Sequence, residues 1–205
     1  QRQHVDEKTR NHLMKVQHES ERAARIGRNF LAFARRHPAE KKPININDVI
    51  KSCLELREYD LRVSGVTIHK DFSTDLPGCY ADAMQLEQVF LNLINNAVHA
   101  MEENEKKELR IRTELADTLV RVRIIDNGRG IPKEMIGRIF DPFFTTKGEG
   151  EGTGLGLSIS YSIVKNHLGH LYVKSSPERG SVFTVELPAV CLLPDEPYDH
   201  AEAWA

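Results

Sequence analysis

Residues 92–97, Asn-Leu-Ile-Asn-Asn-Ala, decide how this chain is to be interpreted, because they lie inside an apolar helical pattern. Two glycine-rich stretches follow them in the sequence: Asp-Asn-Gly-Arg-Gly at 126–130 and Gly-Thr-Gly-Leu-Gly-Leu at 152–157. Asparagine prefers helix caps and turns to helix interiors. Three asparagines within one helical segment therefore indicate a chemical role for its polar face.

Each of the three stretches suits one part of a nucleotide and its metal. Asparagine side chains offer amide oxygens, which Mg²⁺ prefers as ligands. Asp126 can accept a hydrogen bond from the amino group of adenine, and the adjacent glycines let a flat base approach the backbone. The stretch at 152–157 runs into helical spacing, so its N–H groups and a helix N-terminus can bind phosphates. Together they predict a pocket for ATP and Mg²⁺.

Each stretch also has a purely structural interpretation: a solvated helix face, an ordinary turn and a flexible linker. The second glycine stretch lacks the Lys-Ser/Thr of a P-loop and does not follow a strand. These features exclude Walker-type and dinucleotide-binding sites.

Composition narrows the class of protein. The 205 residues carry a net charge of −2, which argues against general nucleic-acid binding. Cys53, Cys79 and Cys191 share no metal-ligand spacing, so we expect free thiols in a reducing compartment. No apolar run approaches the roughly 18 residues that span a bilayer, and no signal peptide opens the chain. We expect a cytoplasmic stretch whose parent protein could be membrane-anchored.

The first part of the chain, 1–43, is predicted to be a helix and a linker. Residues 6–37 lack proline, and small or apolar residues recur in steps of three and four, as in a coiled coil. A solvated connector helix is the alternative. Residues 37–38, His-Pro, end the helix, and 38–44 form a linker.

Residues 44–188 are predicted to form one α/β domain, followed by a tail at 189–205. Asp82 caps a helix with Gln85 three residues later, and Asn92, Asn96 and His99 share its polar face. The predicted helices are 47–63, 82 to about 101 and 155–168; the predicted strands are 66–72, 109–115, 119–125, 170–175 and 181–187.

A long loop at 141–153 follows Phe140. Residues 140–147, Phe-Asp-Pro-Phe-Phe-Thr-Thr-Lys, could be a small satellite core. We favour a mobile lid, anchored by its aromatic residues, whose Lys147 reaches phosphate.

Taken in order, the stretches at 92–96, 126–130, 140–144 and 152–156 resemble the N, G1, F and G2 boxes of the catalytic domain of bacterial sensor histidine kinases. The resemblance covers about 44–188 and includes 163–167 and 180–183. The first box, with its Asn-Ala-x-x-Ala ending, is similar to that of nitrogen-regulatory and sporulation-type kinases.

This resemblance implies the Bergerat ATP-binding fold, a two-layer α/β sandwich, here with a leading long α-helix. It implies that Asp126 contacts adenine, that Asn92 and Asn96 are catalytic and hold Mg²⁺, and that His99 lies near the phosphates cradled by Gly154 and Gly156. The further nucleotide-binding residues that it implies are Gly128, Gly130, Ile131, Phe140, Lys147, Thr153, Leu155, Leu157 and Thr184.

Such kinases transfer the γ-phosphate of ATP to a histidine on a dimeric helical hairpin, from which the receiver domain of a response regulator takes it on an aspartate. Residues 6–37 resemble the second helix of that hairpin. The first helix is missing, and His18 lies in a charged context. We therefore expect the phosphoacceptor histidine outside this chain and a homodimeric parent protein.

Three other functions stay open. Gyrase, the heat-shock chaperone and mismatch-repair ATPases share the fold but place a glutamate one turn before the metal-binding Asn, where this chain has Asn92. An anti-sigma-factor serine kinase would lack the leading helix. A nucleotide-sensing module without catalysis would not need intact boxes.

Overall fold

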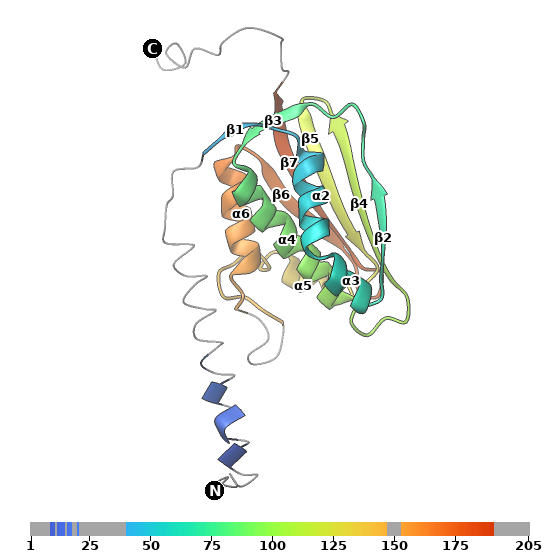
Figure 1. Ribbon diagram of the computed structural model, residues 1–205, viewed down its shortest axis with the longest axis vertical. Coiled ribbons are helices and arrows are strands. Elements are labelled where there is room, and N and C mark those ends of the chain that lie inside the picture. The colour runs from blue at the N-terminus through green and yellow to red at the C-terminus, as the bar shows by residue number, and fades with distance from the viewer. Residues whose placement is uncertain are drawn as a thin grey trace, which may run out of the picture.

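One mixed seven-stranded sheet with helices on one face forms the core of this protein (Figure 1). The computed structural model describes residues 9, 10, 12–14, 16, 17, 20, 40–146 and 153–190. Its elements are β1 (Lys42–Ile44), α2 (Ile46–Leu56), α3 (Glu58–Val63), β2 (Val66–Asp71), β3 (Gly78–Ala81), α4 (Ala83–Ala100), β4 (Lys107–Ala116), β5 (Leu119–Asp126), α5 (Lys133–Ile136), α6 (Gly156–Asn166), β6 (His170–Ser175) and β7 (Ser181–Val190). The predicted two-layer α/β sandwich is confirmed.

Strand β7 lies in the middle of the sheet. The strand order is β1-β3-β7-β5-β4-β2, and β6 also pairs with β7. All pairs are antiparallel except β2 with β4. Alternate residues of β5, beginning with Val120, are buried under the helices, because successive side chains of a strand point to opposite faces. The sheet thus has a covered face and a face that no described helix covers (Figure 1).

Helix α4 occupies the centre of the helical layer, beside α2 and α6 (Figure 1). Leu86, Phe90, Leu93 and Ile94 are fully buried along one side of it. Asp82 caps the helix by accepting a hydrogen bond from the N–H of Gln85 at 3.1 Å, as its sequence predicts. The apolar side therefore faces the sheet, which leaves the asparagine-bearing side free of the core.

The predicted single helix at 47–63 is wrong, because the chain breaks into α2 and α3 at Arg57. The N–H of Arg57 bonds to the carbonyl of Leu54, three residues back, at 3.3 Å. This tighter turn ends α2. The apolar spacing continues unchanged across the break, with Leu54 and Leu61 both buried, so periodicity alone does not reveal it.

Residues 42–44 are a strand rather than the end of a linker. This strand, β1, pairs with β3, and Lys42 lies opposite Ala81. Sequence periodicity misses β3 and α5 because each has only four residues. Strand β7 continues to Val190, two residues into the predicted tail.

The start of α4, the end of α6 and the segment that leads into β1 are joined by hydrogen bonds. The N–H of Asp82 donates to Nε2 of His167 at 3.0 Å, and Nδ1 of His167 contacts the carbonyl of Ile163 at 2.8 Å. Lys41 Nζ donates to the carbonyl of Asn166 at 2.6 Å. Burial lowers the pKa of His167, which keeps Nε2 available as an acceptor.

Only part of the predicted leading helix can be compared with the structure. Residues 9, 10, 12–14, 16, 17 and 20 are helical, whereas the rest of 6–37 and the residues from 191 onward lie outside the described part. No helix among the described residues is long and apolar enough to cross a membrane.

Candidate functional site

A cavity of about 910 Å³ opens between the polar side of α4, the turn after β5 and the start of α6. Three stretches that lie far apart in the sequence meet there. Of the predicted site residues, those that line the cavity are Asn92, Asn96, His99, Asp126, Gly130, Ile131, Thr153, Gly154, Gly156 and Leu157.

Asp126 lies at the end of β5 with only 4% of its surface exposed. Its Oδ1 accepts hydrogen bonds from the N–H groups of Gly128 at 2.9 Å and Ser181 at 3.2 Å. Burial raises the pKa of Asp126 to about 6, although these two donors favour the charged form and act in the opposite direction. Both donors use the same oxygen, so Oδ2 is the one available to a hydrogen-bond donor of a ligand.

Close packing of the turn requires the glycines after Asp126. A Cβ on Gly128 would come within 2.5 Å of the carbonyl oxygen of Ala100 in α4. Gly130 has a φ of 72°, and a Cβ there would lie 2.0 Å from the carbonyl oxygen of Ser176. The turn is thus clamped between α4 and the loop after β6, and only glycine fits at either place. Gly130 also lines the cavity, whereas Gly128 does not, so our expectation that these glycines give room to the base stays a prediction.

Asn92 joins α4 to α6. Its Nδ2 donates to Oγ of Ser160 at 3.0 Å, and its Oδ1 lies so close to Gly156 that a Cβ there would come within 2.2 Å of it. Asn92 therefore holds the start of α6 against α4.

Asn95 is in a different position. It also lines the cavity, but its Oδ1 is buried and has no hydrogen-bond partner among the described residues. An unsatisfied buried acceptor is costly, so Asn95 reduces the stability of α4 rather than adding to it.

Helix α6 begins at the cavity without a side-chain cap. Leu155 is its N-cap residue and makes no side-chain hydrogen bond to the first turn, while Gly156 and Leu157 line the cavity. The first N–H groups of a helix lack partners within the helix. Such an end, with its partial positive charge, suits a phosphate group.

The oxygen ligands in the cavity fit a small hard cation. No group of three or more His, Cys, Asp or Glu side chains in the described residues could hold a metal by itself. The cavity instead offers amide oxygens, because Asn92 and Asn96 line it. This set suits Mg²⁺, which takes few protein ligands and completes its coordination with water and phosphate oxygens.

Four predicted site residues do not line the cavity, and a fifth, Lys147, lies outside the described residues. Phe140 packs on Tyr161, with 5.4 Å between ring centroids, and Leu155 is a core residue. Gly128 packs on α4. Thr184 lies next to Tyr172 in the register of β6 with β7, on the uncovered face of the sheet.

The lining residues that the predictions did not include contain Asn95, Ser181 and Arg57. Asn95 belongs to the asparagine-rich stretch, so its composition was a signal; Ser181 lies in the stretch 180–183 that resembles the family. Arg57 also lines the cavity, and no sequence signal distinguishes it from other basic residues on helix surfaces. The predicted lid at 141–153 is described only at 141–146 and 153, where Phe144, Thr145, Thr146 and Thr153 line the cavity.

Known proteins resemble this chain in both sequence and structure. Residues 81–190 match the family described as histidine kinase-, DNA gyrase B-, and HSP90-like ATPase. Sporulation kinase A of Bacillus subtilis is 36% identical over 150 residues, which are 73% of this chain and 24% of that protein. This chain thus spans about a quarter of that relative.

Two solved structures of the histidine kinase ThkA superpose on this one. Its catalytic domain has a TM-score of 0.66 and 35% identity, covering 73% of this chain and 96% of that domain. ThkA in complex with the response regulator TrrA has a TM-score of 0.74 and 29% identity, covering 92% of this chain and 54% of that one. With the cavity described above, these matches show that the chain belongs to the histidine kinase-, DNA gyrase B- and HSP90-like ATPase family, as a catalytic ATP-binding domain of the sensor histidine kinase type.

Proposed function

We propose that this chain binds ATP with Mg²⁺ and transfers the γ-phosphoryl group to a histidine on a dimeric helical hairpin, for relay to an aspartate of a response regulator. One observation carries the proposal. Three separate stretches bring a buried carboxylate, asparagine amides and an open helix N-terminus to one cavity.

Each part of the cavity has a role in this proposal. Oδ2 of Asp126 accepts a hydrogen bond from the adenine amino group, while Gly128 and Ser181 hold Oδ1. The start of α6 binds phosphate oxygens. Asn92 and Asn96 contribute amide oxygens to Mg²⁺, which neutralises charge on the phosphates when it is bound.

Asn92 supports both the cavity and the metal site. Its hydrogen bond to Ser160 fixes α6 relative to α4. Its Nδ2 donates that bond, and its amide oxygen, Oδ1, is the atom that binds Mg²⁺ in this proposal.

Transfer to a side chain suits this cavity better than hydrolysis does. Asp126 and Glu102 are the only carboxylates among the described residues that line it. Asp126 lies at the base-binding end, and Glu102 pairs with Nδ1 of His99. Position 92 is an asparagine, so it provides no carboxylate to activate a water molecule. We therefore expect the phosphoryl group to be transferred to an acceptor side chain.

The names of the relatives support phosphoryl transfer in a signalling pathway. Sporulation kinase A carries the name of a kinase, and ThkA was solved with a response regulator. The hairpin, a homodimer of the parent protein, and the similarity to nitrogen-regulatory and sporulation-type kinases belong to the proposal. His18, the least unsuitable acceptor in the leading helix, lies outside the described residues.

Labelled ATP tests the proposal directly. The chain is incubated with [γ-³²P]ATP, with and without a separately supplied dimerisation hairpin, and the label is then tested for acid lability. We expect acid-labile label on the hairpin only, because the charged sequence context of His18 makes it an unsuitable acceptor. The variant Asn96→Ala serves as the control and should transfer none.

Two outcomes would contradict the proposal in different ways. Acid-labile label on the chain alone that disappears in His18→Gln would make His18 the acceptor. Release of inorganic phosphate at the same rate with and without a hairpin would make the protein an ATPase instead.

A further inference from the structure

Ser175, the last residue of β6, lies where two loops of the base-binding end meet. One loop is the turn 126–131 at the end of β5, and the other is the hairpin 176–180 between β6 and β7. None of the sequence stretches that resemble the kinase boxes includes this serine. Its hydroxyl nevertheless contacts both loops.

All three hydrogen-bonding positions of the Ser175 hydroxyl are in use. Its Oγ accepts from the N–H of Ile131 at 2.8 Å and donates to the carbonyl of Gly180 at 2.8 Å. Oγ of Ser181 lies 2.9 Å away. Because a hydroxyl has one proton and two acceptor positions, the third bond is donated by Ser181. One side chain thus joins the turn to the hairpin and to the start of β7.

The two loops also fit together at their glycines. A Cβ on Gly130 would lie 2.0 Å from the carbonyl oxygen of Ser176, and a Cβ on Gly180 would lie 1.9 Å from the carbonyl oxygen of Asp126. Each loop therefore has its backbone in contact with the other. Close-packed groups transmit displacements, so a shift of one loop moves the other.

The joined loops contribute groups to the cavity. Ile131, Pro177 and Ser181 line it. The N–H of Ser181 also donates to Oδ1 of Asp126 at 3.2 Å, and Ser181 lies directly opposite Ser175 in the register of β6 with β7. The orientation of the Asp126 carboxylate therefore depends on where Ser175 holds the start of β7.

We propose that Ser175 is a positioning residue for the base: its hydroxyl fixes the turn and the hairpin to each other and so holds Asp126 where it accepts a hydrogen bond from adenine. Ser175 does not line the cavity, so it acts through the groups that it holds. Its effect belongs to the base-binding end and not to the phosphates. This inference rests on the proposed function, because it needs an adenine nucleotide bound through Asp126.

Calorimetric titration of the full chain with AMP, ADP and ATP, each with Mg²⁺, tests this role. For Ser175→Ala we expect affinity to fall by about three- to tenfold, the scale of a neutral hydrogen bond, and by the same factor for all three nucleotides. The losses should be equal because the three nucleotides share the base. Ser175→Thr keeps the hydroxyl and should restore most of the affinity.

The pH dependence of ADP binding separates positioning from a general loss of stability. Burial raises the pKa of Asp126 to about 6, and the N–H of Ser181 acts in the opposite direction because it favours the carboxylate. Ser175→Ala should weaken that bond and raise the pKa of Asp126 further, so ADP affinity should begin to fall at a higher pH than in the wild type. The other titratable side chains described in the cavity lining are unchanged in this variant: Arg57, His99, Glu102 and Arg129.

Thr113→Val is the matched control for the loss of a hydroxyl. Oγ1 of Thr113 accepts from the N–H of Ser73 at 3.0 Å and donates to Oδ1 of Asn47 at 2.8 Å, but Thr113 does not line the cavity. This variant should lower the stability measured by thermal unfolding. It should leave nucleotide affinity and its pH dependence unchanged.

A purely structural role for Ser175 is the competing explanation. Wild-type affinities in Ser175→Ala, a loss confined to ATP, or an unshifted pH dependence would overturn the inference and leave the proposed function intact. If the alanine variant does not fold, Ser175→Cys replaces it, because a thiol is a weaker donor and acceptor and should produce the same changes in smaller measure. A wild-type chain that binds none of the three nucleotides would overturn the proposed function and the inference with it.

Discussion

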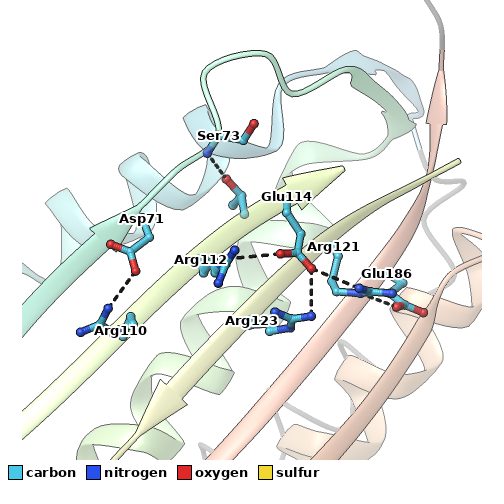
Figure 2. Close-up of polar contacts among 9 residues, drawn as sticks. Asp71, Ser73, Arg110, Arg112, Glu114, Arg121, Arg123 and Glu186 are labelled. Carbon is cyan, nitrogen blue, oxygen red and sulfur yellow. Dashed lines mark hydrogen bonds and ion pairs between the residues drawn. The ribbon is translucent and has the colours of Figure 1, made fainter. Parts of the chain in front are cut away.

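The polar side chains on the two faces of the sheet differ in how far other protein groups bind them. On the uncovered face, Glu114 forms ion pairs with three arginines: Arg112 at 3.3 Å, Arg121 at 3.1 Å and Arg123 at 2.9 Å (Figure 2). Arg121 also reaches Glu186 at 2.7 Å, so that one guanidinium on β5 connects carboxylates of the two strands that flank it, β4 and β7 (Figure 2).

Further polar contacts lie on the same face. Tyr172 donates its hydroxyl to Glu186 at 2.9 Å, and Arg110 pairs with Asp71 at 3.1 Å (Figure 2). Burial alone would raise the pKa of Glu186, but the hydrogen bonds from Arg121 and Tyr172 outweigh it and lower that pKa. These charges are matched within the protein.

On the covered side, both hydrogen bonds to Asp126 go to Oδ1, and among the described residues no side chain caps the first turn of α6 at the cavity. A carboxylate oxygen and a helix N-terminus at a cavity suit a ligand that supplies a donor and a negative charge. The comparison teaches that substitutions on the uncovered face should reduce stability, whereas those in the cavity should reduce function. The predictions below test this division, beginning with the largest effect.

Asn96→Ala should lower phosphotransfer to a supplied hairpin by about a hundredfold or more, the usual scale for losing a group that stabilises the transition state. Stability should stay the same or rise slightly, since alanine is the better helix former. Transfer assays and urea unfolding measure the two quantities. Wild-type activity in the variant would show that Asn96 has no role in phosphotransfer.

Asp126→Ala should weaken binding of adenine nucleotides by roughly 1.5–3 kcal/mol, the range for a hydrogen bond to a charged group. It should also remove any preference for ATP over GTP, because the carboxylate accepts a hydrogen bond from the amino group of adenine. Calorimetry with both nucleotides measures this. Unchanged affinity for ATP would mean that another residue binds the base.

Asp126→Asn should separate stability from function at one position. The pKa of Asp126 is raised to about 6 by burial, so its ionisation opposes folding, and this loss of stability grows as the pH rises from about 4 to 6. The amide keeps an acceptor for Gly128 and Ser181. We expect the variant to be about 1–2 kcal/mol more stable than wild type at pH 7 and to lack this pH dependence.

Urea unfolding at several pH values measures that difference. Nucleotide binding should show the opposite trend in the wild type: affinity for ADP should fall as the pH drops through about 6, where Asp126 becomes protonated. A variant with the same stability profile as wild type would assign the pH dependence to another group.

Glu186→Gln should have the smallest effect, a loss of about 1 kcal/mol of stability with no change in nucleotide affinity. The amide weakens the bonds to Arg121 and Tyr172, and partial solvent exposure limits what such a pair contributes. The lowered pKa of Glu186 means that this stability is present at neutral pH and is lost in acid. Reduced ATP binding in this variant would contradict the claim that the uncovered face contributes to stability and not to nucleotide binding.

The sequence anticipates the elements with long periodic patterns and the motifs that meet in the cavity. Helix α4, with its cap at Asp82, follows from apolar spacing and local hydrogen bonding. The break at Arg57 does not, because Leu54 and Leu61 keep the spacing of an uninterrupted helix.

The candidate site shows the same limit. Asp126 and Asn96 were identified because unusual residue types stand together in the sequence, whereas Arg57 reaches the cavity only through the tertiary fold. Thr184 illustrates the converse: a residue next to a site in the sequence can point to the opposite face of a strand.

The central place of β7 has a consequence for the order of events during synthesis. Its residues, Ser181–Val190, pair with β3, β5 and β6, yet they are the last of these strands to leave the ribosome. Until then β3 and β5 have no neighbour between them, and Asp126 lacks the N–H of Ser181. Chain elongation adds roughly 5–20 residues per second, so the nascent domain spends seconds with an open sheet. The base-binding end of the cavity is therefore completed only when this strand has paired.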